Sequence, residues 1–388
     1  MPPPRSTSLA RVPTLREVTA ALDSLYDPGR AEPWDAIGPV CGDPGTRVER
    51  VLLAVDPVSA VVREALDWGA DLLVTHHPLF LRPVHGVAAT SPKGRVVHDL
   101  IRGGCALHVA HTNADSADPG VSDALAAALG LADLRPLAPE PTDKLVTFVP
   151  HTDAGRVLDA LAAAGAGRIG AYERCAWTAP GIGTFRPTEG AIPTIGSVGA
   201  VEEVQETRLE VVVPRRLRRR VVEALRVSHP YEEPALDVYE LAAGDSAYGT
   251  GRVGRLAAVE PLTDFVRRVA AALPVTAAGV RAAGNPATQV RRVAVCGGAG
   301  DSLLDVVRAE GVDAYVTADL RHHPTSEARE HPGGPTLVDV AHWASEWPWL
   351  ADAARRLTDR LARQGATVVT RVSETPTDPW TLHEGSAR

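Results

Sequence analysis

The chain has 388 residues, 45% of them hydrophobic, and a formal net charge of -8, so its length favours two domains with a core each. The net negative charge does not favour binding to nucleic acid, and no apolar run approaches the ~18 residues of a membrane helix. Residues 1–15 lack a signal-peptide core and the four cysteines include no CxxC pair, so we expect a cytoplasmic protein without a membrane or nucleic-acid partner.

Residues 1–140 predict the first part of an α/β domain. After a Pro-rich start, Leu15–Tyr26 has the pattern of an amphipathic helix that ends at a turn signal. Apolar periodicity then predicts a strand at Val51–Val55, a helix around Val61–Leu66, a strand at Asp71–Thr75, a helix at Arg95–Ile101 and a strand at Cys105–Ala110. Such βαβ units form parallel sheets, which bind ligands beyond the carboxyl ends of their strands.

Histidines and a carboxylate follow two of these predicted strands. His76 and His77 end the run GADLLVTHHPLF, and Pro78 favours a chain that turns away there, so that adjacent side chains can share a site. His111 and Asp115 follow the next strand. Taken alone, the His-His pair also fits two ordinary loop histidines.

The pattern changes over residues 141–245. A β-α-β-β-α-β order, typical of a ferredoxin-like domain, is predicted from segments at Lys144–Val149, Asp153–Ala164, Tyr172–Thr178, Thr207–Val213, Arg215–Val227 and Ala235–Leu241. The Gly- and Pro-rich stretch Gly181–Gly199 is expected to be a long hairpin or loop. The arginines of Arg215–Arg220 are interpreted as a solvated helix face, because no aromatic residues interleave with them.

The α/β rhythm returns over residues 246–375, and residues 376–388 form a C-terminal tail. The predicted elements are a helix at Leu262–Ala272, a strand at Arg292–Val295, a helix at Ser302–Glu310, strands at Ala314–Thr317 and Thr336–Val340, and a helix from about Ser345. The middle domain is therefore expected to be an insert in a discontinuous α/β domain. The turn Gly297–Ser302 fits a tight strand–helix connection or a phosphate cradle, although it lacks the spacing and the lysine of a P-loop.

The two α/β parts contain an internal repeat. GADLLVTHHP at Gly69–Pro78 is echoed by GVDAYVTADLRHHP at Gly311–Pro324. His111 in VAH, followed by Asp115, is likewise echoed by His342 in a second VAH, with a carboxylate again four residues later at Glu346. If a helix begins there, the second histidine and its carboxylate lie on one face within reach of the same ion.

The repeat and the strand ends together predict one metal site. Its expected ligands are His76, His77, Asp115, His342 and Glu346. Five nitrogen and oxygen ligands without sulfur fit one or two ions of zinc, iron or manganese. A pair of ions ~3.5–4 Å apart activates water for hydrolysis. His111 could also be a ligand, but we expect it behind the ligands, where it orients Asp115 or touches substrate.

Six blocks of the sequence resemble one known family, namely Trp34–Asp43, Gly69–Phe80, Val109–Leu131, Gly251–Leu256, Gly297–Ser302 and Val338–Glu346. They look like the NIF-three-like dinuclear metal centre hexameric proteins, which include the GTP cyclohydrolase 1 type 2 homologues. The resemblance implies a two-ion site that faces the interior of a toroidal homohexamer, with the family's ligands at the five expected positions. His229–Leu241 resembles the PII/CutA-like insert of the longer family members.

The expected fold is therefore a discontinuous, duplicated α/β metal-binding domain with an inserted ferredoxin-like, PII/CutA-like α+β domain. The expected function is metal-dependent hydrolysis of a small phosphorylated or nucleotide-like substrate, and the resemblance adds a GTP cyclohydrolase-like activity. The alternative is a non-catalytic metal-binding adaptor, or a metal-trafficking or regulatory protein, that acts through its oligomeric ring and its insert.

Overall fold

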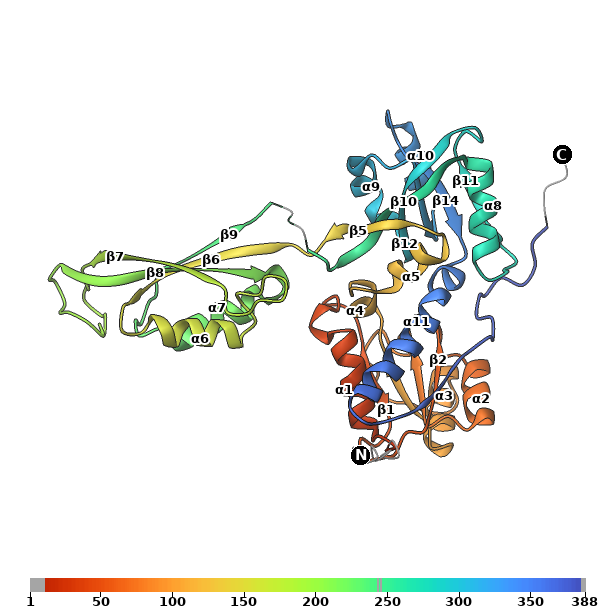
Figure 1. Ribbon diagram of the computed structural model, residues 1–388. Helices are drawn as coiled ribbons and strands as arrows, with labels where there is room; N and C mark the ends of the chain where they lie inside the picture. The colour runs from red at the N-terminus through yellow and green to blue at the C-terminus, as the bar shows by residue number, and fades with distance from the viewer. Residues whose placement is uncertain (1–10, 243, 245, 385–388) are drawn as a thin grey trace, which may run out of the picture. The chain divides into compact units, whose positions relative to one another are not determined.

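A computed structural model describes residues 11–242, 244 and 246–384. The chain divides into two units, which are an α/β unit of Met1–Ala138 and Ala247–Arg388 and an insert unit of Pro139–Ser246 (Figure 1). The Pro-rich start that the sequence predicts before the first helix lies outside the described residues. Within the described ranges, none of the helices combines the length and the apolar character that crossing a membrane requires.

The first sheet of the α/β unit has the strand order β1-β4-β3-β2-β15. Its strands are β1 (Gly38–Cys41), β2 (Arg50–Ala54), β3 (Leu72–Thr75), β4 (Ala106–Val109) and β15 (Val369–Val372). β1 runs antiparallel to β4, and the other neighbours are parallel. The helices beside it are α1 (Leu15–Leu25), α2 (Ser59–Trp68), α3 (Pro92–Arg102) and α11 (His342–Arg363).

Both faces of this sheet are covered, which explains its continuous apolar strands. In β2, Leu53 packs into the core that contains α1 and α11, whereas its neighbour Leu52 packs into the core of α2 and α3. Successive side chains of a strand point to opposite faces, so a strand buried on both sides needs apolar residues at every position. The helices that the sequence predicts here all form, within a few residues of the expected ends.

Four neighbouring strands of the second sheet repeat the topology of the first. Its order is β11-β14-β13-β12-β10-β5. The strands are β5 (Ala132–Pro139), β10 (Gly249–Pro261), β11 (Arg281–Ala283), β12 (Gln289–Ala299), β13 (Ala314–Ala318) and β14 (Thr336–Val340). β12, β13 and β14 are parallel neighbours like β2, β3 and β4, and β11 is antiparallel to β14 as β1 is to β4. The duplication expected from the sequence is therefore present in the fold.

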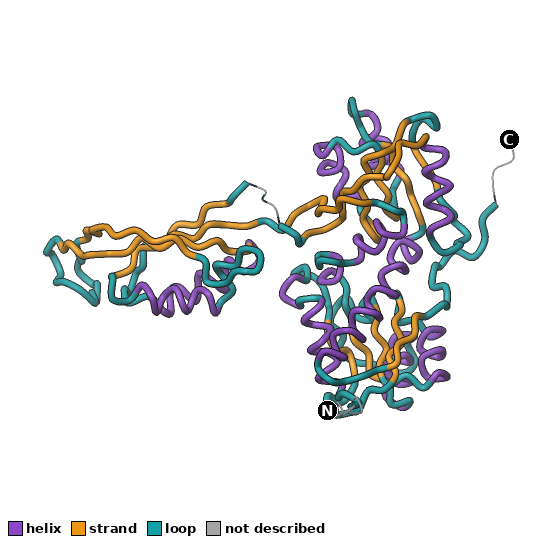
Figure 2. The backbone as a smooth tube through the Cα atoms, in the orientation of Figure 1, coloured by secondary structure: helices purple, strands orange, loops and turns teal. Residues whose placement is uncertain are grey.

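Helix α11 passes between the two sheets (Figure 2). Its buried residues Trp349, Leu350 and Leu357 belong to one core with Val51 of the first sheet and Val293 of the second. The other helices of this unit are α4 (Thr112–Asp115), α5 (Val121–Ala128), α8 (Leu262–Ala272), α9 (Leu304–Glu310) and α10 (His322–Glu330), with 3-10 turns η1 (Pro28–Arg30) and η3 (Asp301–Leu303). A single long helix thus joins the two copies of the repeat.

The insert unit has the predicted β-α-β-β-α-β order. Its elements are β6 (Thr142–Pro150), α6 (Ala154–Ala163), β7 (Ala176–Phe185), β8 (Glu202–Pro214), the 3-10 turn η2 (Arg215–Leu217), α7 (Arg218–Ser228) and β9 (Leu236–Glu240). The strands form an antiparallel sheet in the order β7-β8-β6-β9. Side chains of α6 and α7 share a core with alternate residues of β6 and β8, such as Leu145 and Leu209. This is the ferredoxin-like insert expected from the sequence.

Two boundaries in the insert differ from the prediction. The expected strand Tyr172–Thr178 begins instead at Ala176, and the first residues of the expected loop Gly181–Gly199 continue that strand to Phe185. The ten-residue β7 pairs along its whole length with the longer β8, from Ala176 opposite Val211 to Phe185 opposite Glu202. A Cβ added to Gly183 would lie 2.1 Å from Glu206 Oε2, so this glycine marks a close approach inside a strand rather than a turn.

Several elements were not predicted from the sequence: the long strand β10 and the shorter elements β1, β5, β11, β15, α4, α5 and α10. The final helix starts at His342, three residues before the predicted Ser345, because it follows β14 almost directly. That early start brings His342 into the first turn of α11. It therefore helps to build the site described next.

Candidate metal centre

Strand ends and the start of α11 bring the predicted ligands together inside the α/β unit. His76 and His77 directly follow β3, and the short helix α4 that carries Asp115 follows β4. His342 and Glu346 occupy the first two turns of α11, after β14. Because neighbouring parallel strands end at the same edge of a sheet, these side chains gather where the two copies of the repeat meet.

The imidazole nitrogens converge on one buried carboxylate. Glu346 Oε1 lies 3.4 Å from Nε2 of His76 and 3.0 Å from Nε2 of His342, and its Oε2 lies 3.1 Å from Nε2 of His77. Asp115 Oδ1 lies 3.7 Å from the same nitrogen of His76. Glu346 is only 2% exposed, so its charge is held inside the protein. All five residues predicted as ligands are members of this cluster.

His111 also belongs to the cluster. The potential ligand atoms of His76, His77 and His111 lie within 4.8 Å of one another, as do those of His77, His342 and Glu346. The structure therefore places His111 beside the expected ligands, whereas the sequence analysis expected it behind them. His77 belongs to both groups, so the two sets of donors are contiguous.

Each histidine of the cluster is held from behind through its other ring nitrogen. The Nδ1 atoms are hydrogen bonded to the Ala110 carbonyl for His76 (2.9 Å), to Asp56 for His77 (2.7 Å), to Asp35 for His111 (2.8 Å) and to Asp319 for His342 (2.6 Å). An imidazole that donates from Nδ1 presents the Nε2 lone pair to the opposite side. This is the arrangement by which proteins orient histidine ligands of metals.

The three carboxylates behind the histidines were missed in the sequence analysis. Asp56 stands two residues after β2, and Asp319 directly follows β13, so the rule of strand carboxyl ends could have found both. Asp35 lies in the irregular segment before β1, and no local pattern marks it. Its bonds to His111 and Thr112 outweigh its burial and hold the pKa of the Asp35 carboxyl well below its usual range.

The charges of the cluster favour positive charge at its centre. Burial alone would lower the pKa of His77, but Glu346 and the bond to Asp56 raise it to about 11. The pKa of His342 is raised to about 10 in the same way, against burial, by Glu346 and Asp319. Glu346 itself has its pKa held well below the usual value, because the surrounding histidines outweigh its burial. A bound cation would supply this positive charge in place of protons.

Two buried atoms of the cluster test whether its residues fit a metal ion. His76 Nε2 and Glu346 Oε2 are buried side-chain atoms without a hydrogen-bond partner within the part of the chain that the structure describes. Buried polar atoms rarely stay unsatisfied, so a pair aimed into one cluster needs an explanation. Nitrogen and carboxylate oxygen donors are the ligand types of zinc, iron and manganese. The residues present therefore fit divalent metal ions.

The glycine turn after β12 makes room for this carboxylate. Gly298 has φ +69°, and a Cβ there would lie 2.5 Å from Glu346 Oε1. Its N–H donates to Ser345 Oγ at 2.8 Å, and the N–H of Gly297 donates to Ser122 Oγ at 3.3 Å. These amides already have partners on neighbouring helices, which favours the tight connection over the phosphate cradle.

A cavity of about 320 Å³ adjoins the cluster. His77 and His342 form part of its wall, together with Trp343. The C-terminal segment Thr377–Trp380 lines it as well, and the Thr377 hydroxyl donates a hydrogen bond to Asp56. A segment of the predicted tail therefore reaches the group that orients a candidate ligand.

A family model described as Duf34/NIF3 (NGG1p interacting factor 3) matches residues 13–379. The chain belongs to the Duf34/NIF3 family. It is 52% identical, over 378 residues, to a Mycobacterium tuberculosis protein named GTP cyclohydrolase 1 type 2 homolog, covering 96% of this chain and 98% of the relative. The family resemblance drawn from the sequence blocks is confirmed.

Solved structures also resemble the chain. A Bacillus cereus protein related to NIF3 matches with a TM-score of 0.68 and 35% identity, over 96% of this chain and all of the other. The divalent cation tolerance protein CutA from Archaeoglobus fulgidus matches 26% of this chain and 86% of its own, with a TM-score of 0.21 and 16% identity. The Duf34/NIF3 fold, with the ferredoxin-like insert described above, is the architecture expected from the sequence.

Proposed function

We propose that the protein binds two divalent metal ions per chain, of zinc, iron or manganese, and hydrolyses a small phosphorylated or nucleotide-like substrate beside them. The observation that carries this proposal is a pair of buried atoms, His76 Nε2 and Glu346 Oε2, that have no hydrogen-bond partner among the described residues and lie within a cluster of oriented histidines. The name of the mycobacterial relative agrees with a nucleotide-like substrate.

Some residues of the centre would bind the metal ions, and His111 would transfer protons. When bound, the ions supply Lewis acidity to the hydrolytic step. Glu346 and the oriented histidines hold positive charge in a buried place, where water competes weakly. His111, fixed at Nδ1 by Asp35, lies beside His76 and His77 and would transfer a proton to or from the substrate. Trp343 lines the adjoining cavity and would help to exclude water from the substrate.

Metal analysis and turnover test this proposal together. Chelator-treated protein reloaded with zinc, manganese or ferrous iron should retain close to two equivalents per chain, and a panel of nucleotides and phosphoesters should include a substrate. Asp115→Asn should abolish turnover, whereas the matched variant Asp359→Asn, on the exposed face of α11, should retain it. Well under one equivalent of metal, together with His76→Ala changing nothing, would refute the proposal.

The non-catalytic adaptor or metal-trafficking protein is the second candidate, and the separate insert unit favours it. Tight metal binding with no turnover across the panel would support it, whereas turnover that disappears in Asp115→Asn would argue against it. We also propose that the chain forms a homohexamer in the cytoplasm, where its four free cysteines remain thiols. Sedimentation velocity tests the assembly, and a monomer at micromolar concentration would contradict it.

A further inference from the structure

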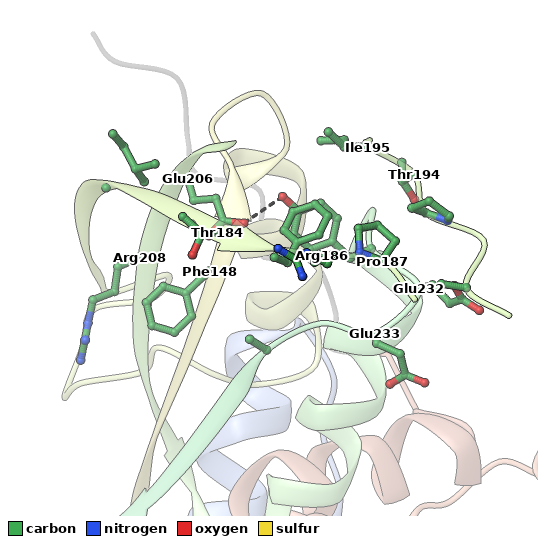
Figure 3. A pocket seen from close by; sticks show the side chains of 18 of the residues that line it. Phe148, Thr184, Arg186, Pro187, Thr194, Ile195, Glu206, Arg208, Glu232 and Glu233 are labelled. Carbon is green, nitrogen blue, oxygen red and sulfur yellow. Dashed lines mark hydrogen bonds between the residues drawn. The ribbon is translucent and has the colours of Figure 1, made fainter. Parts of the chain in front are cut away.

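The insert unit contains a cavity of about 660 Å³ of its own (Figure 3). Its lining is mostly apolar and includes Phe148 of β6, Ile182 and Phe185 of β7, and Pro187 and Ile195 of the loop that follows. A cavity of this size is in the range that holds small organic ligands. Nothing in the proposed function uses it, since every residue of the metal centre lies in the α/β unit.

The walls of this cavity are built before any ligand arrives. The loop after β7 is tied to the segment that follows α7: the Ile192 N–H donates to Glu232 Oε2 at 3.0 Å, and the Thr194 hydroxyl donates to the Pro230 carbonyl at 2.7 Å. Both segments line the cavity. Binding would therefore require little ordering of the chain, which reduces its entropic cost.

A buried carboxylate forms part of the cavity wall. Glu206 is 7% exposed, and its Oε1 accepts a hydrogen bond of 2.8 Å from the Tyr231 hydroxyl, drawn as the dashed line in Figure 3. Burial and the neighbouring Glu206 both raise the pKa of Tyr231, so the hydroxyl remains a donor. The Glu206 side chain fits against β7 because residue 183 is glycine: a Cβ at this position would lie 2.1 Å from Glu206 Oε2.

Among the residues that the structure describes, this carboxylate has no cationic partner in an ion pair. Within residues 11–242, 244 and 246–384, no Arg, Lys or His forms an ion pair with Glu206, although burying an unpaired carboxylate is costly. The nearby Arg208 is engaged by Glu210 at 2.9 Å and lies over the ring of Phe148 at 5.8 Å. His229 donates from Nε2 to the Phe148 carbonyl and accepts from the Tyr231 N–H, and burial lowers its pKa, so it remains neutral.

The cavity therefore combines aromatic walls with buried negative charge. Glu232 and Glu233 add carboxylates to its lining, which also includes the exposed side chains of Arg186 and Arg208. Aromatic faces attract organic cations, and a charge-assisted hydrogen bond to a carboxylate is about twice as strong as a neutral one. An apolar ligand with a positive group at one end would satisfy both features.

We propose that this cavity binds a small organic ammonium compound, whose ammonium group pairs with Glu206 and whose apolar or aromatic body packs against Phe148 and Phe185. The inference does not depend on the metal centre, and either proposal can fail without the other. The ligand would enter between the two loops, with its charged end at the buried carboxylate.

A series of small ligands that share one apolar group and differ in charge tests the proposal on the full-length, unsubstituted protein. Titration calorimetry or ligand-detected NMR would compare phenethylamine, 2-phenylethanol and phenylacetate, which share a phenyl ring and differ in charge. Phenethylamine should bind at least about tenfold more tightly than the other two, since a hydrogen bond between two charged groups is stronger than one that involves a neutral group. Equal binding of the three, or no binding of phenethylamine at millimolar concentration, would overturn the proposal.

Two variants locate the site. Glu206→Gln keeps the shape and removes the charge, and Gly183→Ala pushes the carboxylate aside; each should weaken phenethylamine binding about tenfold or more. Glu203→Gln is the matched control, because this exposed carboxylate lies on the same strand and is not among the residues that line the cavity. Undiminished binding by folded Glu206→Gln, or an equal loss in the control, would contradict the assignment.

Discussion

Replacing Glu346 with glutamine keeps the size of the side chain and removes the charge on which three imidazoles converge at 3.0–3.4 Å. Two unit charges ~4 Å apart interact by about 4 kcal/mol at an effective dielectric constant of ~20. In Glu346→Gln, a divalent ion bound among these donors would lose at least half of this interaction energy, about 2 kcal/mol, which corresponds to a roughly thirtyfold weaker metal affinity. We therefore expect Glu346→Gln to lose most of its metal under conditions in which the wild type is saturated.

Competition with a chromogenic chelator measures this affinity for zinc and manganese, and elemental analysis gives the number of ions retained. Asp359→Asn is the matched control, because this carboxylate lies on the same helix but is exposed and paired with Arg355. Circular dichroism verifies that both variants fold. If Glu346→Gln retains the wild-type affinity and stoichiometry, the buried carboxylate does not bind metal, and the reasoning that places the ions around it is refuted.

Three other perturbations test the surroundings of the site and the fold. Thr377→Val removes the hydroxyl that binds Asp56 and should lower metal affinity about tenfold in the same competition assay; unchanged affinity would show that the C-terminal segment does not support the centre. Arg252 is only 1% exposed, and the Asp123 carboxylate binds its guanidinium through two contacts of 2.8 Å. Asp123→Ala removes this carboxylate and leaves the arginine charge buried without an ion-pair partner, so urea titration should show a loss of about 3 kcal/mol or more in the free energy of unfolding. A loss below about 1 kcal/mol would contradict this. Burial lowers the pKa of His108 in the folded protein to about 4, whereas its pKa in the unfolded chain is ~6.5. Between these two pH values His108 is protonated in the unfolded chain and neutral in the folded protein. Up to about 3 kcal/mol of the stability present above pH ~6.5 is therefore lost as the pH falls toward 4. His108→Leu should remove this loss relative to the wild type, and parallel stability profiles of the two proteins would disprove it.

The helices and central strands of the fold could be predicted from periodicity because their burial is simple. β2, β3 and β13 are covered on both faces and are continuous apolar runs, while α8 has one apolar stripe and was predicted with its observed ends, Leu262 and Ala272. The missed strands are mostly short or peripheral. β10 was missed although it is long, because its three glycines indicate turns locally. One of them, Gly254, is required by close packing, since a Cβ at this position would lie 2.6 Å from the side chain of Leu134.

The candidate site was predictable where donors follow strand ends in both copies of the repeat. Asp115 and Glu346 were found because the second copy echoes the first, and the same rule applied to Asp56 and Asp319 would have added their supporting carboxylates. The placement of His111 depended on the turn after β4. A local pattern does not specify on which side of a cluster such a turn presents its ring.

The sequence by itself determined the order of the central strands and helices, the duplication, the insert and the types of donor atom, because these depend on local periodicity and on residues that recur at equivalent positions. Only the tertiary structure decided which atoms meet. His77 and His342 are 265 residues apart, and their Nε2 atoms lie 3.2 Å apart because two duplicated sheets pack around one helix. The same holds for the insert cavity: Glu206 and Tyr231 are unremarkable residues in the sequence, and their burial beside Gly183 depends on strand register and on two loops that bind each other.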